Sequence, residues 1–300
     1  MKPLVSVVIP TIPSRSKLLQ RAIDSVNKQT YSNIELVVVD EGLPAPVQRN
    51  IGIERSNGDF IAFLDDDDIW MVDKLEEQVK LMGKNPDVPL VVCYSRDMRF
   101  NQDIIHKPPD IITHEMILKS FNLSSTSSYM ARRYPLEQIA TEPDLSKIDS
   151  KCNNCTKQHI CWVDFEVGIW SRKDLICNDI RYILENQYTK KYFDESLPSA
   201  QEYDLAIRLS AIHYVMCTPR ILCEMYSTPG QISENWGRKI SGIMMLYAKH
   251  HKIYKKLGLK KQLVQHIKTI GLLGLFTLGY VFGNKIYNII IPAKKVYEKR

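Results

Sequence analysis

Four consecutive carboxylates follow a short apolar run in the segment GDFIAFLDDDDIW. Phe60 to Leu64 is typical of a buried strand, and Asp65 to Asp68 come directly after it. Hard divalent cations such as Mg²⁺ and Mn²⁺ prefer oxygen ligands, and Mg²⁺ is commonly shared between one or two carboxylates and substrate phosphates. The run therefore predicts a divalent-metal site. Without a metal, we expect one or more of these aspartates to resist ionisation, because four adjacent negative charges repel one another.

A plainer interpretation of the acidic run is a solvated turn that caps the next helix. The surrounding pattern favours the metal site, because apolar strand-like runs alternate with helical segments three times before residue 100. The clearest runs are Leu4 to Ile9, Ile34 to Asp40, the run before the aspartates, and PLVVCY. This alternation predicts an α/β fold with a doubly wound, mostly parallel sheet and right-handed crossovers.

The predicted sheet places three polar segments at one edge. Ligands of such sheets bind beyond the carboxyl ends of the strands. Pro10–Thr11, Asp40–Glu41 and Asp65–Asp68 each follow a predicted strand, so we expect them to converge on one crevice. A helix should follow the first of them, with Ser14 or Ser16 as its cap.

Four stretches of the chain resemble family 2 glycosyltransferases of the GT-A fold, the nucleotide-diphospho-sugar transferase-like fold. They are VSVVIPT, AIDSVNKQTYSNIELVVVDEG, QRNIGIERSNGDFIAFLDDDDIW and FDESLPSAQEYDLAIRL. The likeness is dense over residues 4–85 and resumes at 122–133 and 193–212. It implies an inverting hexosyltransferase-like enzyme that moves a sugar from a nucleotide-diphosphate donor to a hydroxyl acceptor with the help of a divalent metal.

The resemblance also implies a role for each matching residue. Asp65 and Asp67 match the family's Asp-x-Asp motif and would hold Mn²⁺ or Mg²⁺, with Asp67 as the direct ligand. Glu202, in QEYDL, matches the catalytic base. The resemblance also implies the residues that bind the donor. Thr11 lies in the loop that lines the site of the nucleotide base, Asp40 recognises that nucleotide base, and Arg49 lies near the diphosphate. Asp65 and Asp66 in the acidic run are the other implied donor-binding residues. A UDP-sugar is the favoured donor, although Ile12 and Pro13 stand where the family often has an aromatic residue and Asn.

The chemistry of sugar transfer agrees with this division of labour. An inverting displacement needs a base that takes the acceptor's hydroxyl proton, and it needs positive charge on the leaving diphosphate. For Glu202 the alternative is an acid that stabilises a helix N-terminus. Two other functions stay open. A nucleotidyltransferase of sugar phosphates would not need Glu202, and a non-catalytic binding module of a glycan-assembly complex would need neither the Asp-x-Asp motif nor that glutamate.

A cysteine cluster falls where the resemblance is interrupted, in a predicted insertion at residues 134–192. Cys152, Cys155 and Cys161 surround His159 and have ligand types suited to a structural zinc ion. Separate reduced thiols and a disulfide are the alternatives. An odd total of seven cysteines, in a chain whose N-terminus reads as a strand rather than an export signal, favours a reducing, cytoplasmic location.

The last part of the chain differs from the rest in charge. Residues 236–300 carry 14 Lys and Arg and one acid, a net charge of +13, whereas residues 1–235 have a net charge of −7. We therefore predict a catalytic domain at 1–235 and a basic helical tail at 236–300. Thr269 to Gly283 is uncharged but shorter than the roughly 20 residues that span a bilayer.

Two interpretations of this tail are open. It can be a helical hairpin packed on the catalytic domain or on a second subunit of a homo-oligomer, or an anchor lying in the plane of an anionic membrane surface. We favour the second, which makes the protein peripheral at the membrane and brings a lipid-linked glycan of polysaccharide biosynthesis within reach as acceptor. Nucleic acid is not expected as a partner, because no interleaved stacking aromatics or recognised binding motif accompany the basic residues.

Overall fold

A computed structural model describes residues 2–99, 103–120, 123–140, 163–165, 168–170, 191–226, 228 and 236–256. The chain divides into two compact units, Met1–Pro229 and Gly230–Arg300. The helices and strands of the first unit are, in chain order, β1 (Val5–Pro10), the 3₁₀ turn η1 (Pro13–Arg15), α1 (Ser16–Asn27), β2 (Ile34–Val39), α2 (Ala45–Arg55), β3 (Phe60–Phe63), β4 (Ile69–Trp70), α3 (Lys74–Lys84), β5 (Leu90–Asp97), β6 (Ile104–His106), β7 (Ile111–Ile112), α4 (His114–Lys119), the 3₁₀ turn η3 (Thr126–Ser128), β8 (Met130–Arg132), α5 (Arg133–Ile139), β9 (Val163–Phe165), β10 (Gly168–Trp170), α7 (Gln201–Ser210) and β11 (Val215–Met225).

A mixed sheet forms the centre of the first unit. Its strands lie in the order β2-β1-β3-β8-β5-β11-β4, with β6 added to β5 and β7 added to β11. β1 pairs in parallel with β2 and β3, and β5 pairs in parallel with β11. β8 runs antiparallel to both β3 and β5, so these two strands point the same way. The predicted doubly wound, mostly parallel α/β fold is therefore confirmed.

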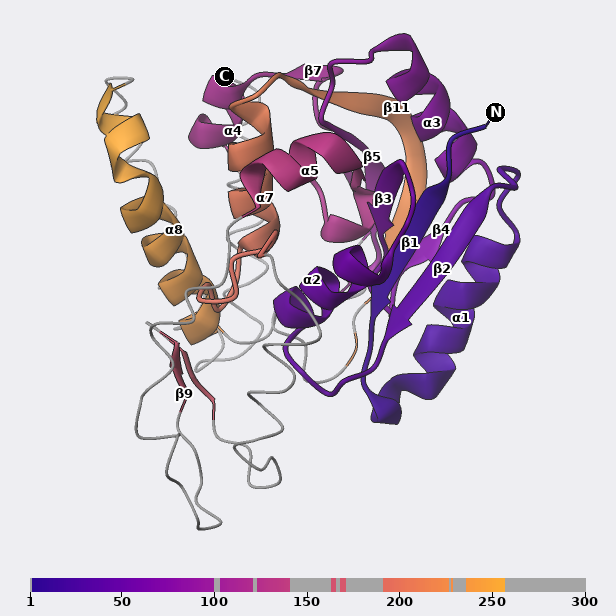
Figure 1. Cartoon of the computed structure of the whole chain (residues 1–300), viewed down its shortest axis with the longest axis horizontal. Helices are drawn as coiled ribbons and strands as arrows, with labels where there is room; N and C mark the ends of the chain where they lie inside the picture. The colour runs from indigo at the N-terminus through magenta and orange to yellow at the C-terminus, as the bar shows by residue number, and fades with distance from the viewer. Residues whose placement is uncertain are drawn as a thin grey trace. The chain divides into compact units, whose positions relative to one another are not determined.

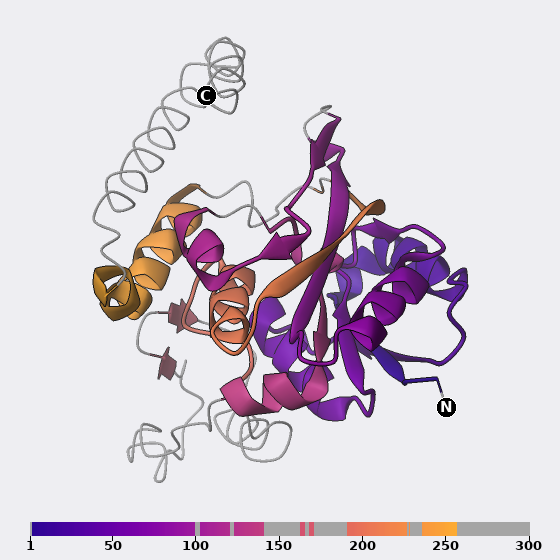
Figure 2. The same cartoon turned by 90° about the horizontal axis from the view of Figure 1, so that it is seen from above.

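Helices cover both faces of this sheet because β1 is buried on both sides. Val5, Val7 and Ile9 pack in one cluster with Ala22 and Val26 of α1. Val8 points to the opposite face, where α2 packs so closely that a Cβ atom on Gly52 would lie 2.3 Å from a Val8 methyl carbon. Figures 1 and 2 show α1 and α3 on one side of the sheet and α2, α5 and α7 on the other.

Parallel strands bring distant segments to one edge of the sheet. Thr11 follows β1, Asp65 follows β3, and Tyr226 and Thr228 follow β11. Because β1, β3, β5 and β11 all point the same way, the chain that leaves each strand emerges at this edge, where α/β folds bind their ligands.

Arg208 of α7 binds the main chain on both sides of residues 141–190. Its guanidinium donates hydrogen bonds to the main-chain carbonyl of Ile139, at 3.1 Å, and to that of Tyr192. The same guanidinium pairs with Asp204, one turn earlier on the helix, at 2.8 Å. The chain at residue 140 and the chain at residue 191 are thus fastened to one side chain, whereas most of the residues between them lie outside the described part of the structure.

The described part of the second unit is the helix α8 (Trp236–Lys256). Lys249, Lys252 and Lys255 are exposed on it, and Leu246 and Tyr254 are buried. None of the helices in the described residues is both long and apolar enough to cross a membrane. The predicted apolar segment from Thr269 to Gly283 lies outside the described residues.

Candidate functional site

The ends of β1 and β3 meet through a side-chain hydrogen bond. Thr11 Oγ1 donates to Asp66 Oδ2 at 2.7 Å, and both residues are buried. Gln48 of α2 extends this contact, because its Nε2 donates to the Thr11 carbonyl at 2.9 Å and its Oε1 accepts from the Glu41 amide at 3.3 Å. The segments after β1, β2 and β3 therefore converge, as the sequence predicts.

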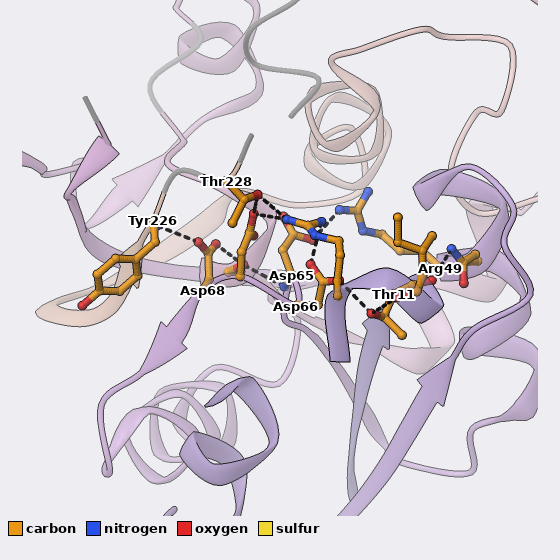
Figure 3. Close-up of polar contacts among 12 residues, drawn as sticks. Thr11, Arg49, Asp65, Asp66, Asp68, Tyr226 and Thr228 are labelled. Atoms are coloured by element: carbon orange, nitrogen blue, oxygen red, sulfur yellow. Dashed lines mark hydrogen bonds and ion pairs between the residues drawn. The ribbon is translucent and has the colours of Figure 1, made fainter. Parts of the chain in front are cut away.

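Two arginines offset the charge of the first three aspartates. Figure 3 labels Arg49, Asp65 and Asp66 of this group. Arg15 places Nη1 2.8 Å from Asp66 Oδ1 and Nη2 2.6 Å from Asp67 Oδ2. Arg49 places Nη2 2.5 Å from Asp65 Oδ1. The repulsion expected among these carboxylates is thus relieved by guanidinium groups from two different elements of the fold.

The pKa values of Asp66 and Asp68 are raised, in agreement with the expectation that part of the run resists ionisation. Burial raises the pKa of Asp66 to about 6, against the lowering effect of its bonds to Thr11 and Arg15. Burial also raises the pKa of Asp68 well above its ordinary value, and the charges of Asp65 and Asp67 raise it further. In a metal-free protein the four carboxyl groups therefore do not all carry a charge at mildly acidic pH.

Asp68 differs from the other three aspartates, because its hydrogen bonds join it to a buried serine and to the main chain. Its Oδ2 accepts from Ser127 Oγ at 2.6 Å, and its Oδ1 accepts from the Tyr226 amide at 3.2 Å (Figure 3). Ser127 Oγ also accepts from the Asp65 amide at 3.0 Å, and the Ser127 carbonyl accepts from the indole of Trp70 at 2.7 Å. One buried serine thus fixes both ends of the acidic run, which makes Asp68 a structural member of the four.

Arg49 is held in place by burial as well as by Asp65. It is 6% exposed, and its guanidinium carbon lies 5.5 Å from the centre of the Phe193 ring. Its Nε is buried and has no hydrogen-bond partner among the described residues. A buried donor without a partner is costly, so this position suits an anionic ligand that would accept from it.

Glu202 lies in the first turn of α7, after a strained residue. Ala200, at the N-cap, has φ 63° and ψ 24°, a left-handed conformation that costs a non-glycine residue roughly 1–2 kcal/mol. Burial raises the pKa of Glu202; Arg49 opposes this rise and Asp65 adds to it. The charge of Glu202 is in turn among the causes that raise the pKa of Tyr129 and of Tyr203. The carboxyl group therefore has aromatic neighbours and interacts electrostatically with the Arg49–Asp65 pair.

The structure brings together most of the residues that the sequence singles out. Thr11, Asp66 and Asp67 share one network through Arg15, and Asp65 and Glu202 both interact with Arg49. Asp40 lies just beyond β2 and is exposed. The predicted zinc ligands Cys152, Cys155 and Cys161 lie outside the described residues, whereas Cys93, Cys217 and Cys223 are buried free thiols.

Sequence reasoning missed Arg15, Thr228 and Ser127. Thr228 Oγ1 donates to Asp67 Oδ2 at 2.9 Å and accepts from Arg15 (Figure 3). A usable signal existed for Thr228, because the run VMCTPRILCEM predicts one more strand whose end should reach the same edge of the sheet. No comparable local signal exists for Arg15 or Ser127, whose roles depend on contacts with residues more than 50 positions away.

The acidic run suits a divalent cation that substrate oxygens complete. Across the described residues, no group of three or more His, Cys, Asp or Glu side chains is arranged to hold a metal ion. Asp65 and Asp67 nevertheless each have a carboxylate oxygen in contact with a cationic guanidinium, which shows that both attract positive charge. Two carboxylates plus substrate phosphates are a common ligand set for Mg²⁺, so the residues present fit such a metal.

Comparison with known proteins places these residues in a family. The family model described as Glycosyl transferase family 2 matches residues 6–46 and 45–140. The chain is 32% identical over 179 residues to TuaG of Bacillus subtilis, whose name places it in teichuronic acid biosynthesis; the match covers 48% of this chain and 70% of TuaG. It is 30% identical over 156 residues to WfgD of Escherichia coli, named as a UDP-Glc:alpha-D-GlcNAc-diphosphoundecaprenol beta-1,3-glucosyltransferase. That match covers 43% of this chain and 60% of WfgD, which is less than two thirds of the relative's length.

Solved structures share the fold at low sequence identity. The mannosyltransferase PcManGT from Pyrobaculum calidifontis, in complex with GDP-Man and Mn²⁺, aligns with a TM-score of 0.53 at 14% identity, over 100% of this chain and 81% of that one. TarS of S. aureus aligns with a TM-score of 0.50 at 13% identity, over 82% of this chain and 39% of TarS. Likeness at this identity shows the fold alone, and the GT-A fold expected from the sequence is confirmed. The match to TuaG, together with the family model and this shared fold, shows that the chain belongs to glycosyl transferase family 2.

Proposed function

We propose that this protein is a metal-dependent, inverting glycosyltransferase that moves a sugar from a nucleotide-diphosphate donor, a UDP-sugar, to a hydroxyl acceptor. One observation carries the proposal: Asp65 of the acidic run and Glu202 of α7 both interact with the buried Arg49. A donor-side carboxylate cluster and a separate carboxyl group are thus coupled electrostatically through one arginine, which supports a shared site. The alternative of a nucleotidyltransferase gives no role to Glu202 in this position.

The donor side has residues for each part of a nucleotide-diphosphate sugar. Thr11 and the exposed Asp40 follow neighbouring parallel strands and are assigned to the nucleoside. Arg49 is assigned to the diphosphate, because its unpartnered Nε requires an acceptor. Asp65 and Asp67 would hold Mn²⁺ or Mg²⁺, which when bound supplies positive charge to the leaving diphosphate. The name of WfgD, with UDP-Glc as donor, supports the choice of UDP.

Glu202 is assigned as the base. As the acceptor oxygen forms its bond to the anomeric carbon, the bond from that carbon to the diphosphate oxygen breaks and the hydroxyl proton passes to the Glu202 carboxylate. A single displacement of this kind inverts the anomeric carbon. The raised pKa of Glu202 suits this role, because a base works best when its pKa lies close to the operating pH.

The test compares two glutamates that both occupy the first turn of a helix. Glu202→Gln should keep donor binding, measured by calorimetry, and lose turnover by roughly 10²–10⁴-fold, the usual worth of general-base catalysis. Glu115→Gln removes the first-turn acid of α4 and should leave both quantities unchanged. The donor comes from a thermal-shift screen of nucleotide sugars with Mn²⁺, and turnover is read as hydrolysis or transfer of that donor. Near wild-type turnover in Glu202→Gln would show that Glu202 is not the base and only stabilises the N-terminus of α7.

We further propose that the protein works at an anionic membrane surface on a lipid-linked glycan. The net charge of +13 on residues 236–300 supports this location, and the diphosphoundecaprenol acceptor in the name of WfgD supports the acceptor class. Replacing the exposed Lys249, Lys252 and Lys255 of α8 by Gln should weaken binding to anionic liposomes by roughly 10²-fold, at about 1 kcal/mol for each lysine.

The matched control removes three exposed lysines from the first unit. A variant with Gln at Lys17, Lys28 and Lys84 has the same net charge as the α8 variant and should bind liposomes like the wild type. Equal loss in the two variants would mean that overall charge, and not α8, attracts the protein to the membrane. A wild-type protein that stays in the supernatant would contradict the membrane location itself.

A further inference from the structure

Arg15 is the cation of this site that lies nearest to solvent. Its side chain is 28% exposed, whereas the side chains of Asp66 and Asp67 are 2% and 9% exposed. It leaves the main chain at the N-cap of α1, where no side chain provides a capping hydrogen bond. The guanidinium therefore covers two buried carboxylates from the outer side.

All the polar contacts of this guanidinium in the described residues go to one small cluster. Nη1 binds Asp66 Oδ1 at 2.8 Å, Nη2 binds Asp67 Oδ2 at 2.6 Å, and Nη2 also donates to Thr228 Oγ1. Arg49 differs, because it is almost fully buried and also packs on the ring of Phe193. Arg15 thus has little beyond these carboxylates to keep it in place.

A divalent cation on Asp67 would compete with Arg15 for the same carboxylate. Metal–oxygen distances for Mg²⁺ and Ca²⁺ are about 2.0–2.6 Å, similar to the length of the Arg15–Asp67 bond. Two positive groups on one carboxylate repel each other, and the repulsion is weakly screened because the carboxylate of Asp67 is only 9% exposed. Binding of the metal therefore favours the release of Arg15 from Asp67.

We propose that Arg15 is a built-in counter-ion that holds the place of the metal on Asp67 and passes to the donor's diphosphate when the metal binds. The inference rests on the proposed function, since it takes Asp67 as the metal ligand. In the metal-free protein Arg15 keeps Asp66 and Asp67 oriented. Once displaced, the long and partly exposed side chain carries its charge and its forked donors to the phosphate oxygens, for which guanidinium geometry is well matched.

The experiment measures two affinities that should move in opposite directions. Mn²⁺ binding is followed by electron paramagnetic resonance of the free ion, without nucleotide, in wild type, Arg15→Gln and Lys17→Gln. Arg15→Gln should bind Mn²⁺ about tenfold more tightly, a change of about 1.4 kcal/mol, because the competing cation is gone. Lys17→Gln loses the same charge from the exposed first turn of α1 and should stay within about twofold of wild type, because exposed charges are screened.

Uridine diphosphate is then titrated at saturating Mn²⁺. Arg15→Gln should bind it about tenfold more weakly, because the contact with the diphosphate is missing. A residue that only stabilises the fold would weaken both ligands together. Arg15→Lys keeps the positive charge but cannot bridge two carboxylates, so its Mn²⁺ affinity should fall between those of wild type and Arg15→Gln. If Arg15→Gln folds poorly, Arg15→Lys still tests the inference, because it should bind Mn²⁺ more tightly than wild type.

The outcomes separate this inference from the proposed function. If wild type binds Mn²⁺ and Arg15→Gln binds it equally or less tightly, the counter-ion role is wrong while the metal site stands. If Mn²⁺ affinity rises but uridine diphosphate affinity is unchanged, the transfer of Arg15 to the diphosphate is wrong. If wild type and the three variants bind Mn²⁺ neither alone nor together with uridine diphosphate, the metal site is wrong and the inference is wrong with it.

Discussion

Replacing Asp66 by asparagine should change the way in which the stability of the metal-free protein depends on pH. Asp66 is 2% exposed, and burial raises its pKa from 3.8 to about 6. Between these two values the native protein keeps a proton that the unfolded chain has released. Because the native state then binds more protons than the unfolded state, the free energy of unfolding falls as the pH rises through this window.

The size of the effect follows from the two pKa values. Each unit of pKa difference is worth about 1.36 kcal/mol, so a rise from 3.8 to about 6 corresponds to about 3 kcal/mol lost between about pH 4 and pH 7. The side chain introduced by Asp66→Asn does not titrate and can keep both contacts. Its carbonyl oxygen accepts from Arg15, and its amide donates to the hydroxyl of Thr11, which can rotate to accept.

Urea unfolding, followed by tryptophan fluorescence in EDTA at several pH values between about 4 and 7, tests this reasoning. Subtracting the free energy of the Asp66→Asn variant from that of the wild type cancels the titration of the groups that do not interact with Asp66, which leaves Asp66 as the main source of the difference. The difference should fall by about 3 kcal/mol across the window. Asp24→Asn, which replaces an exposed aspartate on α1, should give a flat difference. If wild type and the Asp66→Asn variant change in parallel, Asp66 is already ionised in the native state and the reasoning from burial is wrong.

Three further predictions follow from the same geometry. Asp67→Asn should abolish the effect of Mn²⁺ on donor affinity, measured by calorimetry with and without EDTA; a wild-type affinity that EDTA leaves unchanged would contradict the metal's role. The dependence of kcat/KM on pH should rise through a pKa above the 4.5 of an ordinary glutamate, because burial raises the pKa of Glu202 and only its carboxylate form accepts a proton. A rise centred at or below 4.5 would disagree with that environment. Gly52→Val should lower the free energy of unfolding by about 1–3 kcal/mol, since a Cβ atom there would lie 2.3 Å from a Val8 methyl carbon. Gly83→Val has no atom within 4 Å of its Cβ and serves as the control in the same denaturation experiment.

Much of the sheet could be predicted because strands such as β1 and β3 are buried on both faces. Such strands form continuous apolar runs. The predicted run Leu4 to Ile9 differs from the observed β1 by one residue at each end, and Ile34 to Asp40 ends one residue after the observed β2. β8 could not be found in this way. It has three residues, too few for a periodic pattern, and its antiparallel place between β3 and β5 is set by tertiary pairing.

The candidate site could be predicted where it depends on strand ends and not where it depends on long side chains. Thr11 and Asp66 meet because parallel strands end at one edge. The sequence also predicts Ser14 or Ser16 as the cap of the first helix. That prediction is wrong: Arg15 occupies the N-cap without a capping hydrogen bond. Local preference favours serine there, but the Arg15 side chain binds Asp66 and Asp67, and a contact with residues so distant in the chain leaves no local pattern.

The bonds from Arg208 to the carbonyls of Ile139 and Tyr192 fasten both flanks of residues 141–190 to one side chain of α7. A replacement segment of another length can therefore be joined to the same two points. For a flexible replacement, each doubling of length costs only about 0.6 kcal/mol of closure entropy. Arg208 also marks where a laboratory chimera should be joined, with the new segment starting after residue 140 and ending before residue 191.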